Sequence, residues 1–136
     1  MFHLTRVLAI IAILIMVGCA SSPSGKTFDS AQGEWTFEFK TMTNKSRSTR
    51  MKIIDETKAN YEFNGGRIFF YAVDDQGKWE GYWVEDEAPD ISCTEKKDGS
   101  NVWGVSTLQF NETYSSFTGE WDVCGKGTKY PQSGFR

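Results

Sequence analysis

Short segments in which apolar and polar residues alternate, each bounded by a turn signal, constrain this chain more than any other feature. The clearest is residues 33–40, where Trp35, Phe37 and Phe39 fall on one face and polar or charged residues on the other. A period of two is the signature of a half-buried β-strand, and no stretch beyond residue 32 has convincing helical periodicity. The pattern predicts about eight strands: 33–40, 48–54, 58–63, 67–73, 78–85, 91–96, 102–110 and 116–124.

The turns between these segments favour an antiparallel meander. Asn64-Gly65-Gly66 is a strong hairpin signal, because turns with a positive φ cost Gly and Asn least. After the first eighteen residues the chain is rich in aromatics but has a single leucine, Leu108, and this composition favours strands over helices. We therefore predict an all-β fold, either a small up-and-down, lipocalin-like barrel or a strongly bent sheet, since closure removes exposed strand edges.

A repeat of glycine and tryptophan recurs in three of the predicted strands, at Gly33-Glu34-Trp35, Gly81-Tyr82-Trp83 and Gly119-Glu120-Trp121. In a strand, the glycine and the tryptophan point to the same face. The missing side chain then lets a neighbouring aromatic ring lie over bare backbone, or lets the strand bend. We expect these tryptophans to build and close the core. The alternative is that some of them line a ligand pocket: Trp35, Trp79, Trp83 and Trp121.

The order of the motifs also carries a resemblance. G-x-W is followed by Asn64-Gly65-Gly66-Arg67-Ile68, then by W-x-G-x-W-x-E ending at Glu85, then by F-x-G-x-W. This arrangement resembles small β-domains of exported bacterial proteins and lipoproteins whose function is unassigned. The resemblance spans most of the chain after the first eighteen residues, and it implies a fold more than an activity.

The N-terminal residues have the layout of an export signal. Arg6 precedes an apolar run over residues 7–17 that is too short to span a bilayer core of about 30 Å. Met16-Val17-Gly18-Cys19 resembles the lipobox of bacterial lipoproteins, in which the chain is cut before the cysteine. In that family the thiol receives diacylglycerol and the new amino terminus is acylated. Cleavage after Ala20 by an ordinary signal peptidase is the open alternative.

These observations predict the domain organisation. The signal peptide covers residues 1–18, and lipidation falls on Cys19. The segment 19–32, rich in Ser, Gly and Pro, reads as a flexible linker, and 33–136 forms one β-domain. If the sorting habits of lipoproteins carry over, Ala20 after the cysteine favours the outer membrane of a diderm bacterium.

Two cysteines remain after Cys19, namely Cys93 and Cys124. An even pair in an exported chain predicts a disulfide between them. Such a bridge would close a loop of about thirty residues and stabilise the fold by roughly 3–4 kcal/mol in the chain-entropy model.

Several kinds of chemistry are absent from the predicted domain. The one histidine, His3, lies in the signal, which excludes a Ser-His-Asp or Cys-His arrangement and the commonest zinc sites. After residue 18, the 14 Lys and Arg remaining once Arg6 is removed face 18 Asp and Glu, and this net charge of −4 argues against a nucleic-acid partner. We predict no cofactor and no metal.

Two groups of carboxylates need separate consideration. Glu80 and Glu120 flank the glycine and tryptophan repeats and could in principle support glycoside hydrolysis, but alternation points both away from the tryptophans. The run Glu85-Asp86-Glu87 with Asp90 has the charge for Ca²⁺ but lacks the spaced ligands of a calcium loop, so a solvated acidic turn is the better interpretation.

A basic run lies between Phe39 and Ile54, with no acidic residue inside it. It is a candidate contact for an anionic partner, such as lipid headgroups, or else a solvated outer face paired with Glu38 or Glu62, and we favour the second. Its members are Lys40, Lys45, Arg47, Arg50 and Lys52.

The first functional hypothesis is a non-enzymatic envelope lipoprotein, anchored to the membrane, that binds an envelope protein or a small apolar ligand or supports envelope structure. The second is an inhibitor of an extracellular enzyme such as lysozyme. Lipoprotein inhibitors of lysozyme carry a Ser-Gly-x-x-Tyr loop, whereas the nearest turn here, Asp98-Gly99-Ser100-Asn101, lacks the tyrosine. A hydrolase acting through Glu80 or Glu120 ranks last.

Overall fold

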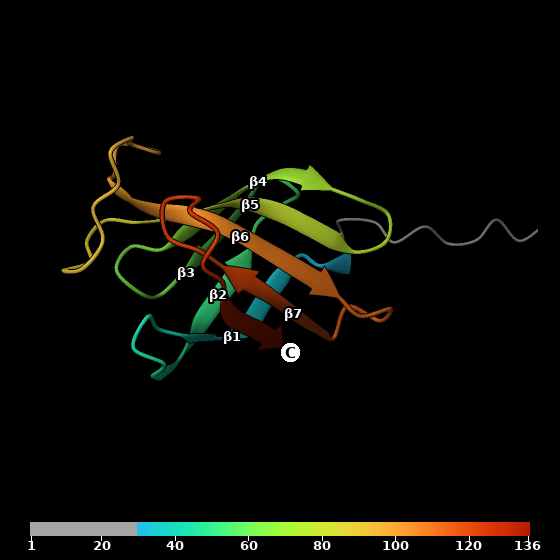
Figure 1. The fold of residues 1–136 in the computed structure, drawn as a ribbon. Coiled ribbons are helices and arrows are strands. Elements are labelled where there is room, and N and C mark those ends of the chain that lie inside the picture. Colours follow the sequence, from blue (N-terminus) through green and yellow to red (C-terminus); the bar gives the residue numbers. More distant parts are fainter. Residues whose placement is uncertain (1–29) are drawn as a thin grey trace, which may run out of the picture.

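The computed structural model describes residues 30–136, which form one closed barrel of antiparallel strands (Figure 1). Residues 30–136 are all-β, as predicted, and of the two predicted architectures the barrel is correct. Each strand pairs with its sequence neighbours, and the first pairs with the last. The strands are β1 (Gly33–Lys40), β2 (Ser46–Ile53), β3 (Lys58–Tyr61), β4 (Arg67–Val73), β5 (Lys78–Glu85), β6 (Val102–Phe110), β7 (Ser116–Trp121) and β8 (Tyr130–Phe135).

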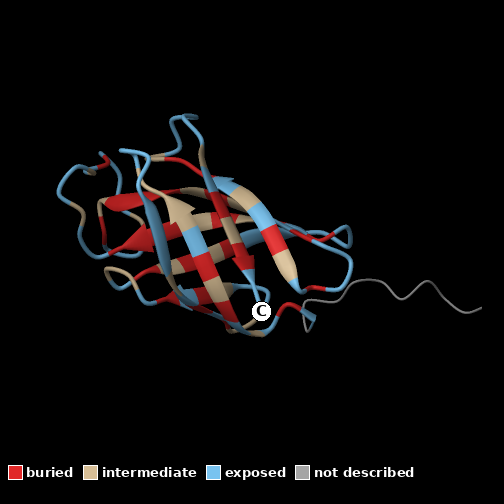
Figure 2. Cartoon of the chain, turned by 90° about the horizontal axis from the view of Figure 1, so that it is seen from below, coloured by how far each residue is buried: buried red, intermediate tan, exposed pale blue. Residues whose placement is uncertain are grey.

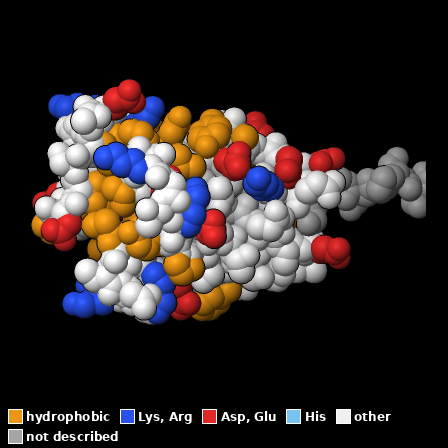
Figure 3. All heavy atoms as spheres, viewed as in Figure 1, with side chains coloured by type: hydrophobic (Ala, Val, Ile, Leu, Met, Phe, Trp, Pro, Cys, Tyr) orange, Lys and Arg blue, Asp and Glu red, His pale blue; other side chains and the backbone are white. Residues whose placement is uncertain are grey.

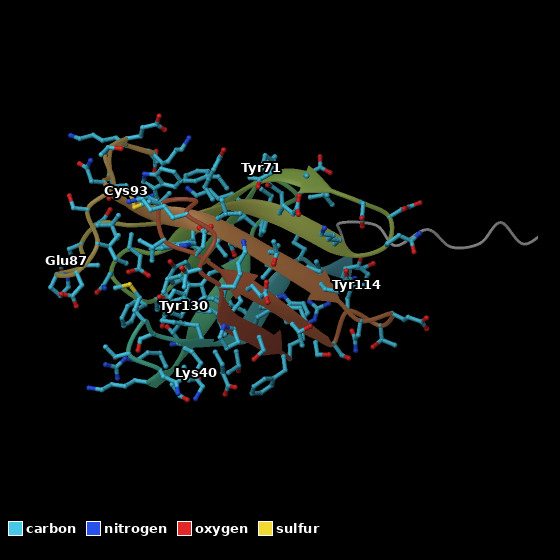
Figure 4. All side chains as sticks on the ribbon, viewed as in Figure 1. Lys40, Tyr71, Glu87, Cys93, Tyr114 and Tyr130 are labelled. Carbon is cyan, nitrogen blue, oxygen red and sulfur yellow. A yellow bond between two sulfur atoms is a disulfide. The ribbon has the colours of Figure 1, made fainter. Side chains whose placement is uncertain are left out.

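The connections alternate between the two ends of the barrel, because neighbouring strands run in opposite directions. The segments 41–45, 62–66, 86–101 and 122–129 meet at one end, which we call the mouth. The other end, which we call the closed end, receives the described N-terminus and the hairpins after β2, β4 and β6 (Figure 1). Figure 4 shows Glu87 at the mouth and Tyr114 toward the closed end.

Aromatic side chains fill the barrel from the closed end to its middle. Buried residues alternate with exposed ones along the strands, so that one face of each lines the interior (Figure 2). Trp35 packs on Phe110 and Phe117 with ring centroids 5.4 Å apart, and Trp79 lies 5.2 Å from Phe110. This layer is fully buried and leaves no room for a ligand.

The C-terminal arginine seals the closed end. The Arg136 guanidinium lies 4.4 Å from the centre of the Trp35 ring and donates hydrogen bonds to the carbonyls of Ser30, Gln32 and Tyr114. Trp35 Nε1 donates to the Ala31 carbonyl at 2.8 Å, and Ala31 is fully buried. The described part of the chain therefore begins at the closed end.

One predicted strand is absent and one observed strand was not predicted. Residues 91–96 form no strand and belong to the 86–101 connection. One backbone bond, from the Cys93 amide to the Asn101 carbonyl, and one side-chain bond, from Asn101 Nδ2 to the Cys93 carbonyl, take the place of a strand ladder there. The eighth strand is instead β8, in which Pro131, the inward-facing Gln132 and Gly134 hide the alternation. The prediction for 91–96 was wrong, since alternation over so few residues does not ensure a pairing partner.

Two of the three repeat glycines, Gly81 and Gly119, allow neighbouring strands to come close. A Cβ at Gly81 would lie 2.3 Å from the Phe69 carbonyl oxygen, and one at Gly119 would lie 1.8 Å from that of Thr107. Gly81 also lies at the irregularity in the pairing of β4 with β5, so the strand bends there.

The predicted disulfide between Cys93 and Cys124 is present, with the two Cα atoms 5.5 Å apart. It ties the 86–101 connection to the 122–129 connection across the mouth. None of residues 30–136 belongs to a helix long and apolar enough to cross a membrane.

Candidate functional site

The mouth holds a cavity of about 280 Å³ whose walls are mainly apolar and include six aromatic side chains. Strands β1, β3, β5 and β7 each supply rings, because these strands end or begin at the mouth with the inward-facing residues of the alternation. Hydrophobic side chains gather at this end of the molecule, with Lys and Arg side chains around them (Figure 3). The aromatic lining comprises Phe37, Phe39, Tyr61, Phe63, Trp83 and Trp121.

Hydrogen bonds fix two of these rings in the wall of the cavity. Trp83 Nε1 donates to the Asp122 carbonyl at 2.7 Å, and Trp121 Nε1 donates to the Lys40 carbonyl at 3.0 Å. The two indoles meet edge to face at 5.5 Å. This part of the cavity wall is therefore held in one arrangement.

Glu85, the last residue of β5, places a buried carboxyl in this aromatic wall. Its side chain belongs to a residue only 8% exposed, with Oε1 accepting from the Tyr61 hydroxyl at 2.9 Å and Oε2 from Asn64 Nδ2 at 3.3 Å. Among residues 30–136, no Lys or Arg forms an ion pair with it.

Burial raises the pKa of Glu85 from 4.5 to about 7, and the hydrogen bonds from Tyr61 and Asn64 offset this only in part. The pKa of Tyr61 is raised well above 10, first by its own burial and then by the charge of Glu85. Tyr61 is therefore a permanent donor, whereas Glu85 changes its charge near neutral pH.

The 86–101 connection forms one side of the cavity through Ala88, Pro89 and Ile91. Arg67 holds this connection in place. Its guanidinium bonds Asp86 at 2.9 Å and Asp98 at 2.5 Å. Together with the disulfide, this ion-pair network keeps the long connection against the barrel rather than free in solvent.

Of the four tryptophans predicted as possible ligand-lining residues, two line the cavity and two do not. Trp83 and Trp121 line the cavity. Trp35 and Trp79 lie in the filled layer below and are 2% and 0% exposed.

The residues of the basic run also lie in different places, two at the cavity and three away from it. Lys45 and Arg47 lie at the rim of the cavity, exposed to solvent. Arg50 lies on the outer face, 3.4 Å from the Glu62 carboxylate, and Lys52 is also exposed. Lys40 donates to the Ser46 hydroxyl. These side chains do not form one contiguous basic patch.

The acidic residues likewise separate. Glu85 points into the barrel, while Asp86 pairs with Arg67 outside, so the predicted acidic turn is not one solvated cluster. Within residues 30–136, no group of three His, Cys, Asp or Glu side chains is placed to hold a metal ion. Glu80 lies on the outer face, 3.2 Å from Lys78 Nζ, and Glu120 is exposed.

The turn Asp98-Gly99-Ser100-Asn101, which was compared with the lysozyme-inhibitor loop, forms contacts within the protein. The Asp98 carboxylate binds Arg67, and the Ser100 hydroxyl donates to the Glu85 carbonyl at 2.5 Å. Cys19, the predicted signal peptide and most of the predicted linker lie outside the described residues.

Sequence reasoning assigned Glu85 to a solvated turn and missed its place in the cavity. The sequence did contain the relevant signal. Every second residue of β5 points into the barrel, and Glu85 belongs to this set together with Trp79, Gly81 and Trp83.

Comparisons of the chain with family models, curated proteins and solved structures found no match.

Proposed function

We propose that this protein is a non-enzymatic, lipid-anchored binding protein of the bacterial envelope, which holds a small and largely apolar molecule in the mouth of its barrel. The observation that carries the proposal is the aromatic cavity at the mouth of a barrel that is otherwise filled. Barrels of eight strands can hold one small ligand, and concave apolar sites with few polar groups are the usual form of such sites.

The size and build of the cavity support a small molecule as the occupant. A volume of about 280 Å³ is at the lower end of the range for ligand sites, which runs from roughly 300 to 1,000 Å³. The walls are fixed by the Trp83 and Trp121 hydrogen bonds and by the disulfide, so little ordering would oppose binding.

The direction of the mouth agrees with a membrane anchor. The described chain enters at the closed end, where Arg136 bonds the Ser30 and Gln32 carbonyls. A tether through Cys19 and the 19–32 linker would attach there, at the end of the barrel opposite the mouth, so the anchor would leave the cavity uncovered. The outer membrane remains the proposed location on the basis of Ala20.

Calorimetric titration with 1-octanol tests the function. Burial of an eight-carbon chain contributes at most about 6 kcal/mol, at roughly 0.8 kcal/mol per methylene, and the cost of association subtracts from this, so we expect a dissociation constant in the millimolar range. The Ala88→Trp variant should bind at least about tenfold more weakly, a loss of roughly 1.4 kcal/mol, because the indole would fill the cavity from the 86–101 connection.

Ala72→Trp is the matched control, because Ala72 is exposed near the end of β4 that lies at the closed end of the barrel. It should leave octanol binding unchanged. Equal binding by wild type and Ala88→Trp, or no binding by wild type, would contradict the proposal. The absence of octanol binding together with inhibition of lysozyme would support the inhibitor hypothesis instead.

A further inference from the structure

One of the polar groups that line the cavity, the Glu85 carboxyl, is unusual because it is buried and forms no ion pair with a Lys or Arg of residues 30–136. Glu85 is buried, and its two partners, the Tyr61 hydroxyl and the Asn64 amide, are both neutral donors. Each carboxylate oxygen accepts one of these bonds and has a further lone pair for a ligand. A glutamine could hold Tyr61 in the same way, so the positioning of Tyr61 does not by itself require a carboxyl.

Burial of an ionised carboxylate is unfavourable unless a cation or several donors compensate it. The pKa of Glu85 is raised because burial disfavours its ionised form. A cationic ligand group beside the carboxylate would stabilise the ionised form, whereas an anionic group would destabilise it further.

The surroundings of Glu85 are suited to a cation as well. The cavity wall carries the rings of Tyr61, Trp83 and Phe37, and Tyr61 packs edge to face on Phe37 at 5.4 Å. The faces of aromatic rings attract ammonium groups, most strongly where water is excluded, and aromatic cages bind quaternary ammonium ligands in this way. A carboxylate beside such rings provides both the charge and the apolar contacts that an amine with an apolar body requires.

We infer that the mouth cavity selects a cationic amphiphile, an amine or quaternary ammonium with a short apolar body, whose positive group lies against Glu85 and the aromatic wall. This inference rests on the proposed binding function and specifies its ligand class. Lys45 and Arg47 at the rim do not oppose it strongly, because both are exposed to solvent and salt screens their charge.

The test compares three eight-carbon probes by calorimetry at pH 8, each below its self-association concentration: octyltrimethylammonium, 1-octanol and octyl sulfate. We expect octyltrimethylammonium to bind at least about tenfold more tightly than octanol, and octyl sulfate to bind most weakly. In Glu85→Gln this preference for the cation should disappear, while the octanol affinity stays within about twofold.

Glu56→Gln is the matched control. Glu56 is exposed in the hairpin after β2, at the closed end of the barrel, so removal of its charge should change the cation affinity by less than about twofold. A near-ultraviolet circular dichroism spectrum of each variant establishes that its aromatic core is intact.

The pH dependence gives a second readout. The wild-type affinity for octyltrimethylammonium should fall at least about tenfold from pH 8 to pH 5 as Glu85 becomes protonated, and Glu85→Gln should show no such fall. The probe carries a permanent charge, so only protein groups titrate. The other titratable or charged groups at the cavity are Tyr61, Lys45, Arg47 and Asp90, and Glu85→Gln retains them all.

The outcomes separate the inference from the function on which it rests. Octanol binding that Ala88→Trp abolishes, together with equal or weaker binding of the cation, would overturn the inference and leave the binding function intact. Failure of all three probes to bind would overturn both. A cation preference that persists in Glu85→Gln would also overturn the inference, because it would assign the selectivity to other groups.

Discussion

Replacement of both Cys93 and Cys124 by serine is expected to lower the free energy of unfolding by about 3–4 kcal/mol. The disulfide joins residues 31 positions apart, so its loss frees a long loop in the unfolded chain and raises that state's entropy. Equilibrium urea unfolding of the oxidised wild type and of the double variant measures the difference. Wild type measured in reducing agent should match the variant.

The disulfide has a local effect beside the global one. Without it, the 86–101 connection is held mainly by the Arg67 ion pairs and by the bonds between Cys93 and Asn101. That connection carries the Ala88 and Ile91 wall of the cavity. A loss of less than about 1 kcal/mol would contradict this account, because it would mean that the cross-link constrains neither state.

Glu85 should make the protein less stable as the pH rises through neutrality. Its pKa is raised from 4.5 to about 7 in the folded state, so between these values the folded protein binds the proton that the unfolded chain has released. Stability is therefore greatest below pH 4.5 with respect to this group and decreases until the pH passes 7. The shift corresponds to roughly 3 kcal/mol at full ionisation.

Glu85→Gln isolates this effect, because the amide does not titrate. Urea unfolding of both proteins at pH 5 and pH 8 should show wild type losing roughly 2.5 kcal/mol relative to the variant over that interval, since part of the shift lies below pH 5. Parallel changes in the two proteins would contradict the burial of an unpaired carboxyl at the mouth. A cationic ligand at saturation should remove part of the loss at pH 8.

The barrel was predictable because most strands carry the alternation on their own residues. The segment 33–40 matches β1, and 67–73 matches β4, residue for residue. Whether a segment pairs as a strand depends, however, on neighbours that are distant in the sequence. This explains the two errors, the predicted strand at 91–96 and the unpredicted strand β8. β8 is stabilised by its neighbours β7 and β1, and a Cβ at Gly134 would lie 2.1 Å from the Phe117 ring, so the strand requires a glycine where a pattern expects an apolar side chain.

The candidate site was less accessible from sequence than the fold. The meander itself implies that the connections 41–45, 62–66 and 86–101 meet at one end. Whether a cavity forms there depends on how far the rings fill the barrel, and Trp35 with Phe110 and Phe117 fills only the lower part. Glu85 lies at an inward-facing position of β5 but also begins the acidic run Glu85-Asp86-Glu87. The acidic run led to the prediction of a solvated turn, although the strand alternation indicated an inward side chain.

The indole N–H resonances test the central claim, that the mouth of a filled barrel is the binding site. In a ¹⁵N-labelled protein titrated with octyltrimethylammonium, the signals of Trp83 and Trp121 should shift, because both rings line the cavity. The signals of Trp35 and Trp79, in the filled layer, should not move. Saturable shifts confined to Trp83 and Trp121 are the predicted result, and shifts centred on Trp35, Trp79 or Trp103, or none at all, would contradict it.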